Sequence, residues 1–318
     1  MNNIHLVQAA RASSIIYSML MSLHHKRPWL LPANICPIVP IIFLKVGMPF
    51  QLVDISDTTL HIDLDQVADY VKTRKFGGLL YAHTYGEAST PNEYFSTIKD
   101  IAPELLVIDD RCLCIPEVAF DVYNKADVQL FSTGYAKIVE LNFGGYAFLN
   151  EQVDYQPVHL PYNPQHHETI ERSYKDAINK QEKFVYEDNN WLETEADMPF
   201  WMDYQQKIET NLGPSLEHRE LLNSIYAQRL PEETQLPRKY QTWRFNIRLK
   251  NKQYFLNEIF SSGLFASSHY ASLAAIMDDS HAPHAENLAS HVINLFNDHH
   301  FTASQAARIC EIISEKFS

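Results

Sequence analysis

Two runs decide the fold: Leu105-Leu-Val-Ile-Asp-Asp110 and, one strand further on, Val128-Gln-Leu-Phe-Ser-Thr-Gly-Tyr-Ala-Lys137. The first predicts a buried strand ending in two carboxylates, and the second predicts a strand that leads to Ser132 and Lys137. The carboxyl ends of parallel strands in an α/β sheet open onto the ligand crevice. A desolvated lysine there can form a Schiff base with an aldehyde cofactor, and an aspartate can hold a pyridinium nitrogen protonated.

The region around these runs alternates between strand and helix patterns. Strands are predicted at 28–35, 50–55, 78–83, 105–108 and 128–131, with another beginning at 145, and helices at 8–23, 37–46, 64–72 and 91–100. Strands that alternate with helices of this length indicate crossover units around a mostly parallel sheet. We therefore predict an α/β fold whose first domain, residues 1–160, holds a central sheet flanked by helices.

The second half of the chain has a different pattern. Residues 169–183 and 200–229 are polar and helix-rich, and a proline-containing segment follows at 231–237. Short strand and helix patterns then alternate to the end of the chain. The sequence predicts a helical connector at 161–235 and a small C-terminal α+β domain at 236–318.

Glycine is scarce, with nine residues in the chain, yet Gly134 and Gly144-Gly145 closely follow the second run. Glycine lets a backbone turn tightly or approach a ligand. We expect these glycines to serve a ligand site, and ordinary turn chemistry is the alternative.

The composition excludes several classes of partner. The formal net charge is −13 and there is no basic run, which argues against a nucleic-acid partner. No apolar run is long enough to cross a bilayer, and the N-terminus lacks the features of a signal peptide. The four cysteines form no zinc or disulfide pattern, and the histidine pairs lie in polar contexts. We predict a cytoplasmic protein without a metal site or membrane partner.

Short motifs recur in a fixed order along the chain. They are Leu31-Pro-Ala-Asn-Ile-Cys-Pro37, Gly47-Met-Pro-Phe-Gln-Leu-Val-Asp54, Ala82-His-Thr-Tyr-Gly86, Val107-Ile-Asp-Asp110, Phe131-Ser-Thr-Gly-Tyr-Ala-Lys137 with Gly144-Gly145, and His269-Tyr270 with Val292-Ile-Asn-Leu-Phe296. Together they resemble the DegT/DnrJ/EryC1/StrS family of pyridoxal-phosphate (PLP) sugar aminotransferases. That family has the fold type I, aspartate aminotransferase-like architecture, with a large α/β domain and a small α+β domain.

The resemblance implies a role for each site residue. Lys137 would form the internal aldimine with PLP and shuttle protons at the substrate carbon, and Asp110 would pair with the pyridinium nitrogen. Ser132 would hydrogen-bond the cofactor phosphate. Backbone N–H groups at Ala12 and Ser13 would bind the same phosphate, since a helix N-terminus favours an anion.

The resemblance also implies a reaction and an assembly. The enzyme would move an amino group from a donor such as glutamate to a keto-sugar nucleotide, in the synthesis of surface polysaccharide (lipopolysaccharide) or of a secondary metabolite. Such enzymes build their active sites across a dimer interface, so we expect a homodimer.

Three departures from the family pattern leave alternatives open. Cys36 would contact the cofactor ring where the family commonly has an aromatic side chain, and Leu113 stands where the family has Gln or His near the phenolic oxygen. The chain also begins almost on the phosphate-binding helix, as in an N-terminally short, divergent member. The alternatives are another PLP-dependent reaction, such as dehydration or decarboxylation, and a non-catalytic relative.

Individual residues also have simpler interpretations. Asp109 and Asp110 resemble a phosphoacceptor or Mg²⁺ pair, although the order of the other residues fits that class poorly. Ser13 and Ser14 could simply cap and pack the first helix. The motifs place Tyr135 and His83 near the site without assigning a role to either, and a histidine such as His83 is more often a satisfied core residue than a catalytic one.

Overall fold

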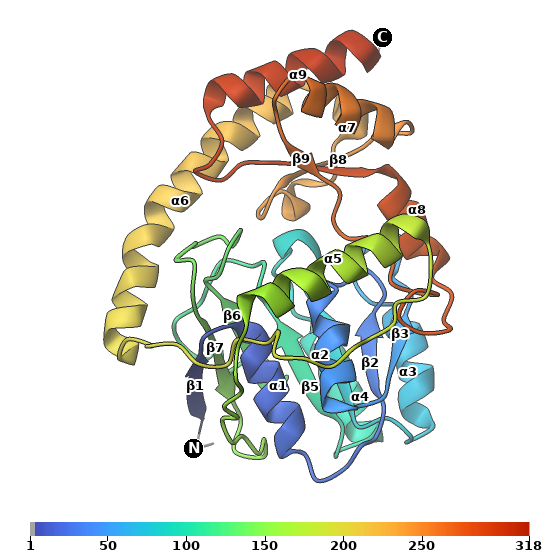
Figure 1. The fold of residues 1–318 in the computed structure, drawn as a ribbon, viewed down its shortest axis with the longest axis vertical. Coiled ribbons are helices and arrows are strands. Elements are labelled where there is room, and N and C mark those ends of the chain that lie inside the picture. The colour runs from blue at the N-terminus through green and yellow to red at the C-terminus, as the bar shows by residue number, and fades with distance from the viewer. Residues whose placement is uncertain (1–3, 318) are drawn as a thin grey trace.

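A seven-stranded sheet forms the centre of the computed structural model, which describes residues 4–317. Residues 1–3 and 318, at the ends of the first and last predicted domains, lie outside the described residues. The strands, in sheet order, are β1 (His5–Ala9), β7 (Gly145–Leu149), β6 (Val128–Ser132), β5 (Leu106–Asp110), β4 (Gly78–Ala82), β2 (Trp29–Pro32) and β3 (Phe50–Val53). The five strands β6, β5, β4, β2 and β3 are parallel to one another, whereas β7 is antiparallel to both β6 and β1. The predicted mostly parallel sheet is confirmed (Figure 1).

Helices cover both faces of this sheet (Figure 1). On one face lie α1 (Ala12–Ser22) and α2 (Ile38–Val46), and on the other lie α3 (Leu64–Lys72) and α4 (Asn92–Ile101). Side chains alternate along a strand, so Leu80 and Ile108 join the core under α1 and α2, while Leu79 and Val107 join the core under α3 and α4. Burial on both faces explains why these strands are continuous apolar runs in the sequence.

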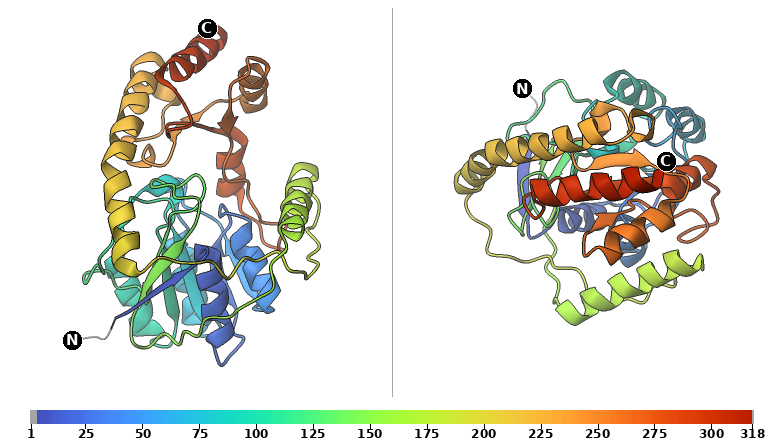
Figure 2. Two further views of the ribbon diagram at one scale, coloured as in Figure 1. Left: turned by 60° about the vertical axis from the view of Figure 1, so that its left-hand side comes forward. Right: turned by 90° about the horizontal axis from the view of Figure 1, so that it is seen from above.

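The chain then forms two long helices and a smaller sheet. α5 (Pro164–Lys180) lies over the α1 and α2 side, and α6 (Trp201–Arg229) runs along one edge of the molecule up to the smaller sheet (Figures 1 and 2). The smaller sheet is antiparallel, with the order β8 (Phe245–Arg248), β10 (Val292–Leu295) and β9 (Ala266–Ser267). The other elements are η1 (Thr84–Gly86), η2 (Glu232–Thr234), η3 (Arg238–Tyr240), α7 (Lys252–Ser261), α8 (Pro283–His291) and α9 (Ala303–Phe317).

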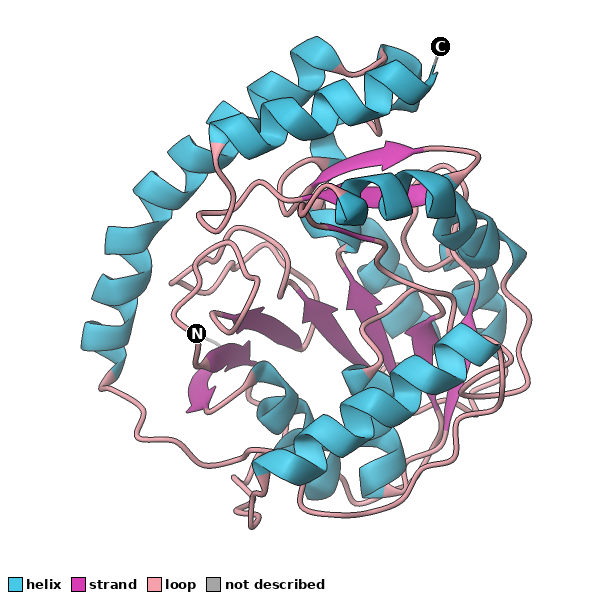
Figure 3. Cartoon of the chain, turned by 45° about the horizontal axis from the view of Figure 1, so that its top comes forward, coloured by secondary structure: helices cyan, strands magenta, loops and turns pink. Residues whose placement is uncertain are grey.

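We call residues 245–317 the C-terminal part. α7 and α9 share an apolar core with its sheet and with the last turns of α6. Figure 3 shows this part above the carboxyl ends of the large sheet's parallel strands. The domain boundaries at 160 and 235 stay predictions. Among the described residues, no helix combines the length and apolarity that a bilayer crossing requires.

The N-terminus corrects one prediction. The pattern predicts a helix from residue 8, but Gln8 and Ala9 belong to β1, and α1 begins only at Ala12. β1 pairs with β7 from His5 opposite Leu149 to Ala9 opposite Gly145. An unpaired sheet edge leaves backbone donors and acceptors exposed, and pairing with that edge outweighs the local helical pattern.

Gly145 lies where β1 passes into α1. A Cβ atom at Gly145 would lie 2.2 Å from the backbone nitrogen of Ala12, far inside van der Waals contact. Gly145 also pairs with Ser132 at the end of β6. The missing side chain therefore lets the N-terminus of α1 lie directly against β7, next to the strand that carries Ser132.

Replacing Gly145 with alanine should lower the free energy of unfolding by about 1–3 kcal/mol, because backbone atoms of α1 must move to make room. Urea unfolding followed by far-ultraviolet circular dichroism measures the change. Gly134→Ala is the matched control, because its Cβ would lie 3.6 Å from its nearest neighbours, an ordinary contact. Its stability should stay within about 0.5 kcal/mol of wild type. Equal losses in both variants would contradict this account of Gly145.

Candidate active site

Asp109 and Asp110 end β5 and point to opposite sides of the sheet, as strand alternation requires. Asp109 is 0% exposed and accepts hydrogen bonds from His83 Nε2 and Asn124 Nδ2, both at 2.6 Å. Burial raises the pKa of Asp109, but the charge and hydrogen bond of His83, helped by Arg111, bring that pKa below its usual value. Asp109 is thus an ionised structural anchor, and the two carboxylates do not converge as a Mg²⁺ pair would.

His83 is a fully satisfied buried histidine. Its second nitrogen, Nδ1, contacts the carbonyl oxygen of Glu87 at 2.5 Å. Both ring nitrogens therefore face oxygen acceptors, on the Asp109 side of the sheet. The structure gives His83 a role in packing, as the simpler interpretation of the sequence predicts.

Asp110 faces the side of α1 and α2, together with Lys137 and two thiols. Burial raises the pKa of Cys36, the Lys137 ammonium opposes that rise, and the Asp110 carboxylate adds to it. Burial also raises the pKa of Cys112 well above its usual value, and the same two charges act on it in the same directions. Cys36 and Cys112 both pack against the apolar core under α1 and α2, on the same side of the sheet as Asp110. One Asp110 oxygen also accepts a hydrogen bond from the Cys112 N–H at 3.0 Å.

Side chains from α5 and from the C-terminal part surround the same place. Burial raises the pKa of Tyr270 well above its usual value, and Cys36 and Asp110 add to the rise. Burial, together with the positive charges of Arg244, Lys175 and Lys137, lowers the pKa of His269 to about 4. The loop that carries both residues is tied to the large sheet, because the Leu273 N–H donates to the Ala33 carbonyl at 2.9 Å.

Arg11 and Ser132 flank Gly134 at the beginning of α1. A Cβ atom on Gly134 would lie 3.6 Å from both Arg11 Nη1 and Ser132 Oγ, so the guanidinium and the hydroxyl approach the same small space. Arg11 is the N-cap residue of α1 and makes no capping hydrogen bond through its side chain. The first N–H groups of a helix, here those of Ala12 and Ser13, have no partner within the helix. A guanidinium, a hydroxyl and a helix N-terminus together form a donor set that suits a phosphate.

Glu193 organises this donor set from the segment between α5 and α6. Its Oε2 accepts a hydrogen bond from Arg11 Nε at 2.9 Å, and its carbonyl oxygen accepts one from Ser14 Oγ at 2.5 Å. Ser14 therefore has the packing role that was one of its two interpretations. Ser13 is half-buried at the open end of the helix.

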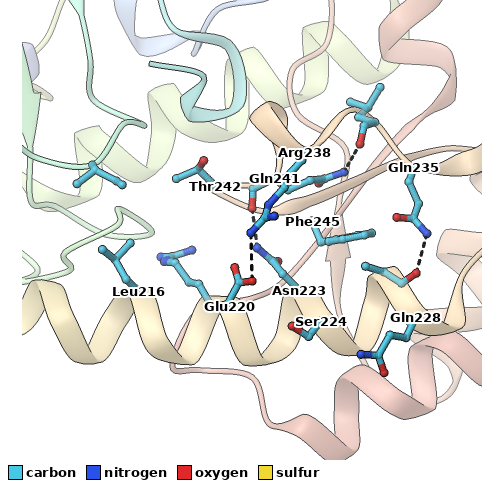
Figure 4. A pocket seen from close by; sticks show the side chains of 14 residues that line it. Leu216, Glu220, Asn223, Ser224, Gln228, Gln235, Arg238, Gln241, Thr242 and Phe245 are labelled. Atoms are coloured by element: carbon cyan, nitrogen blue, oxygen red, sulfur yellow. Dashed lines mark hydrogen bonds and ion pairs between the residues drawn. The ribbon is translucent and has the colours of Figure 1, made fainter. Parts of the chain in front are cut away.

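A cavity of about 580 Å³ lies between α6 and residues 235–245 (Figure 4). Its lining includes neither Lys137 nor Asp110, and it belongs to a different place in the molecule. Its polar side chains bond largely to one another: Asn223 Nδ2 donates to the Gln241 carbonyl at 2.9 Å, and Arg238 lies 3.5 Å from Glu220. We therefore place the candidate active site at Asp110 and Lys137, and Arg219 lies between that site and this cavity.

The structure separates the sequence-predicted residues into three groups. Asp110 and Lys137 both influence the pKa of Cys36, and Ser132 lies with Ala12 and Ser13 at the N-terminus of α1. Tyr135 points away, with 68% of its surface exposed, and Leu113 is buried in the core.

Sequence reasoning missed Arg11 and gave no role to Tyr270. Arg11 is the only lysine or arginine among the first 25 residues and directly precedes the predicted phosphate-binding helix. That isolated positive charge could have identified Arg11 as a candidate phosphate-binding residue. Tyr270 reaches the site through long-range packing that no local pattern encodes.

Comparisons with known proteins identify the fold. No family model and no curated protein matches the sequence. Among solved structures, the chain is similar to a DegT DnrJ EryC1 StrS aminotransferase from Brucella abortus, with 14% identity, 98% of this chain and 85% of that chain covered, and a TM-score of 0.67. It is similar to the putative sugar aminotransferase Spr1654 from Streptococcus pneumoniae in its PMP form, with 15% identity, 98% and 88% covered, and a TM-score of 0.71.

A third similar structure is DesI in the presence of its TDP-sugar product, with 14% identity, 97% of this chain and 79% of that chain covered, and a TM-score of 0.72. Likenesses at this level of identity define the fold. The chain therefore has the fold of the PLP-dependent sugar aminotransferases, as the sequence motifs predict.

Replacing Asp109 with alanine should cost about 3–5 kcal/mol of stability, because His83 and Arg111 would lose a buried counter-charge. The lowered pKa of Asp109 sets the sign of the pH effect. Its contribution is complete above the ordinary carboxyl pKa of about 3.9 and is lost as the pH falls through the lowered value. Urea titrations between about pH 5 and pH 2, which span the fall below the ordinary carboxyl pKa, should show a flatter acid limb in the variant.

Asp110→Ala is the control next to it in sequence. Asp110 is half-buried, and its described hydrogen bonding is to Cys112 alone. Its loss should change stability by no more than about 1 kcal/mol. An Asp110 variant that is as unstable as the Asp109 variant would refute the division of roles between the two carboxylates.

Proposed function

We propose that this protein is a PLP-dependent aminotransferase that acts on a keto-sugar nucleotide, with Lys137 as the lysine that binds the cofactor. The observation that carries the proposal is that Asp110 ends β5 while the neighbouring parallel strand β6 ends at Ser132 and leads into the loop that carries Lys137. An amine and an acid delivered by neighbouring strands suit the aldehyde and the ring nitrogen of PLP. The shared fold with sugar aminotransferases supports the same conclusion.

The residues present fit this cofactor. Asp110 would hold the proton on the ring nitrogen, and Cys36 would contact the ring. Ser132, the N–H groups of Ala12 and Ser13, and additionally Arg11 would hold the phosphate. When bound, PLP supplies an electron sink that allows a proton to leave the carbon next to the donor's amino group.

Lys137 would carry the proton transfers. Its Nζ takes a proton from the donor carbon in the first half of the reaction and gives one to the sugar carbon in the second. Asp110 would remain paired with the ring nitrogen throughout. The net reaction exchanges the donor's amino group for the carbonyl oxygen of the sugar.

The proposal also includes the substrate, the amino donor, the pathway, the oligomeric state and the location that the sequence predicts. DesI, a structural neighbour, was solved with its TDP-sugar product, which supports a nucleotide-linked sugar as substrate here. Glutamate as donor, a role in surface polysaccharide or secondary-metabolite synthesis, and a homodimer follow from the resemblance of the motifs. All four cysteines are unpaired, which agrees with a cytoplasmic location.

The first test uses purified protein mixed with PLP and then with glutamate. Wild type should develop a visible absorption band that glutamate bleaches, and after borohydride reduction mass spectrometry should find the cofactor on Lys137. Lys137→Ala should lack the band. Lys175→Ala, which removes another lysine near His269, should keep it. The absence of any band in wild type would refute the cofactor assignment.

A second PLP reaction remains a candidate because of Leu113. Leu113 is buried and lacks a polar side chain, at the position where the resembled family has Gln or His. A band that depends on Lys137 but does not respond to glutamate or other amino donors would favour dehydration or decarboxylation over amino transfer.

The phosphate assignment has its own test. Arg11→Met should weaken binding of PLP about tenfold, the effect of losing one hydrogen bond to a charged group at a partly exposed position, and should leave binding of pyridoxal unchanged. Fluorescence titration measures both affinities. Arg27→Met, at an arginine paired with Glu104 instead, is the control and should change neither. Equal weakening of PLP and pyridoxal by Arg11→Met would remove Arg11 from the phosphate site.

A further inference from the structure

The loop that carries Lys137 is held from outside by side chains of α6 and of the segment before β8. Three consecutive carbonyl oxygens of this loop accept hydrogen bonds. Trp243 Nε1 donates to Ala136 at 2.7 Å, Arg219 Nη2 to Lys137 at 2.9 Å, and Ser215 Oγ to Ile138 at 2.5 Å. No secondary structure of the loop itself satisfies these oxygens, so its path at Lys137 depends on the three donors.

The backbone next to Lys137 has little stability of its own. Ala136 adopts a left-handed conformation with φ of 58°, which is unfavourable for a residue with a Cβ atom. Its N–H donates to Glu140 Oε2 at 2.8 Å. Surrounding contacts must therefore hold this turn in place.

Arg219 is the central member of the three donors. It is 2% exposed, and its Nη1 donates to the Trp243 carbonyl at 2.7 Å and to Asn297 Oδ1 at 2.6 Å. Trp243 precedes β8 and Asn297 follows β10, which is antiparallel to β8, so one buried guanidinium binds two chain segments at the same end of the smaller sheet as well as the Lys137 carbonyl. Its rigid fork of donors can make these bonds together, which a lysine cannot do.

Trp243 links the same network to the site from a second direction. Its ring is nearly parallel to that of Tyr270, with an interplanar angle of 9° and centroids 6.3 Å apart. Tyr270 packs against the same apolar core as Cys36 and Cys112. A movement of the C-terminal part, which carries Tyr270 and Asn297, would therefore reach the Lys137 loop through Trp243 and Arg219.

We propose that Arg219 is the positioning residue for Lys137 and that, through Arg219 and Trp243, the placement of the C-terminal part sets the position of the lysine amine. The inference rests on the proposed role of Lys137 but concerns how the chain holds that lysine. A purely structural Arg219 would support folding without controlling the lysine. The two roles differ in what happens to Lys137 in a folded variant.

The test measures acetylation of Lys137 in the cofactor-free, full-length protein, by mass spectrometry after brief exposure to acetic anhydride. Arg219→Met should change the labelling rate of Lys137 about tenfold, the factor for losing one hydrogen bond from a charged donor. The rate at Lys72, an exposed lysine on α3, should stay the same and serves as the internal reference. With PLP added, visible circular dichroism should also change, since it reports the orientation of a bound chromophore.

Asn223→Ala is the matched control. Asn223 lies one turn after Arg219 on α6 and bonds to Asn297 and to the Gln241 carbonyl, but not to the Lys137 loop. It should leave Lys137 labelling and visible circular dichroism at wild-type values. A folded Arg219→Met variant with wild-type values for both would overturn the proposal, whatever its melting temperature.

Two further variants keep the test decisive if Arg219→Met does not fold. Trp243→Phe keeps an aromatic ring but removes the N–H donor to the Ala136 carbonyl. It should change Lys137 labelling in the same direction by a smaller factor. Arg219→Lys should restore part of the wild-type labelling, because it retains one charged donor. Wild-type labelling in both would overturn the proposal. A wild-type protein that binds no PLP would defeat the proposed function alone, since the labelling needs no cofactor.

Discussion

Strand alternation at the end of β5 is the constraint from which the candidate site follows. Two adjacent carboxylates cannot face the same side of a sheet, so Asp109 and Asp110 serve opposite layers of the molecule. On one side of the sheet, Asp109 joins His83, Asn124 and Arg111 in a buried, charge-balanced cluster. That cluster fixes the chain after β4, after β5 and before β6. It holds the strand end that presents the other carboxylate to the site.

The site itself is assembled from parts that differ in rigidity. Asp110 and Ser132 end strands of the large sheet, and the first turn of α1 is pressed against Gly145. The lysine comes from a loop whose backbone depends on donors more than seventy residues further along the chain. The cofactor-binding groups of the proposed enzyme therefore stand on a fixed frame, while the reactive amine depends on how α6 and the C-terminal part are placed.

The sequence predicts the frame well because the frame obeys local rules. Buried parallel strands are apolar runs, and α3 begins where Asp63 caps it and ends as its pattern predicts. The motif order also predicts a site built from Cys36, Asp110 and Lys137, and that site stays a prediction. The prediction fails at β1, where pairing with a distant strand decides the structure, and a pattern within one segment carries no information about that partner.

The residues that hold the site in place from outside could not be predicted from the sequence, for a related reason. Arg219 lies in a polar helical stretch in which every arginine resembles a solvated surface residue, yet it is buried against the Lys137 loop. Two of its acceptors, at Trp243 and Lys137, are backbone carbonyls, which leave no trace in the sequence. Arg11 differs, because a lone charge before a predicted anion-binding helix can be recognised without knowledge of the tertiary structure.

The two thiols next to the lysine bear on chemical selectivity. A sulfur nucleophile competes with an amine for an aldehyde, and it does so as the thiolate. Burial raises the pKa of both Cys36 and Cys112, so at neutral pH both remain protonated and weakly reactive. In the proposed enzyme, the low polarity around these side chains would leave the aldehyde to the lysine. The two thiols would then line the site as small apolar groups, much as methyl groups would in the same positions.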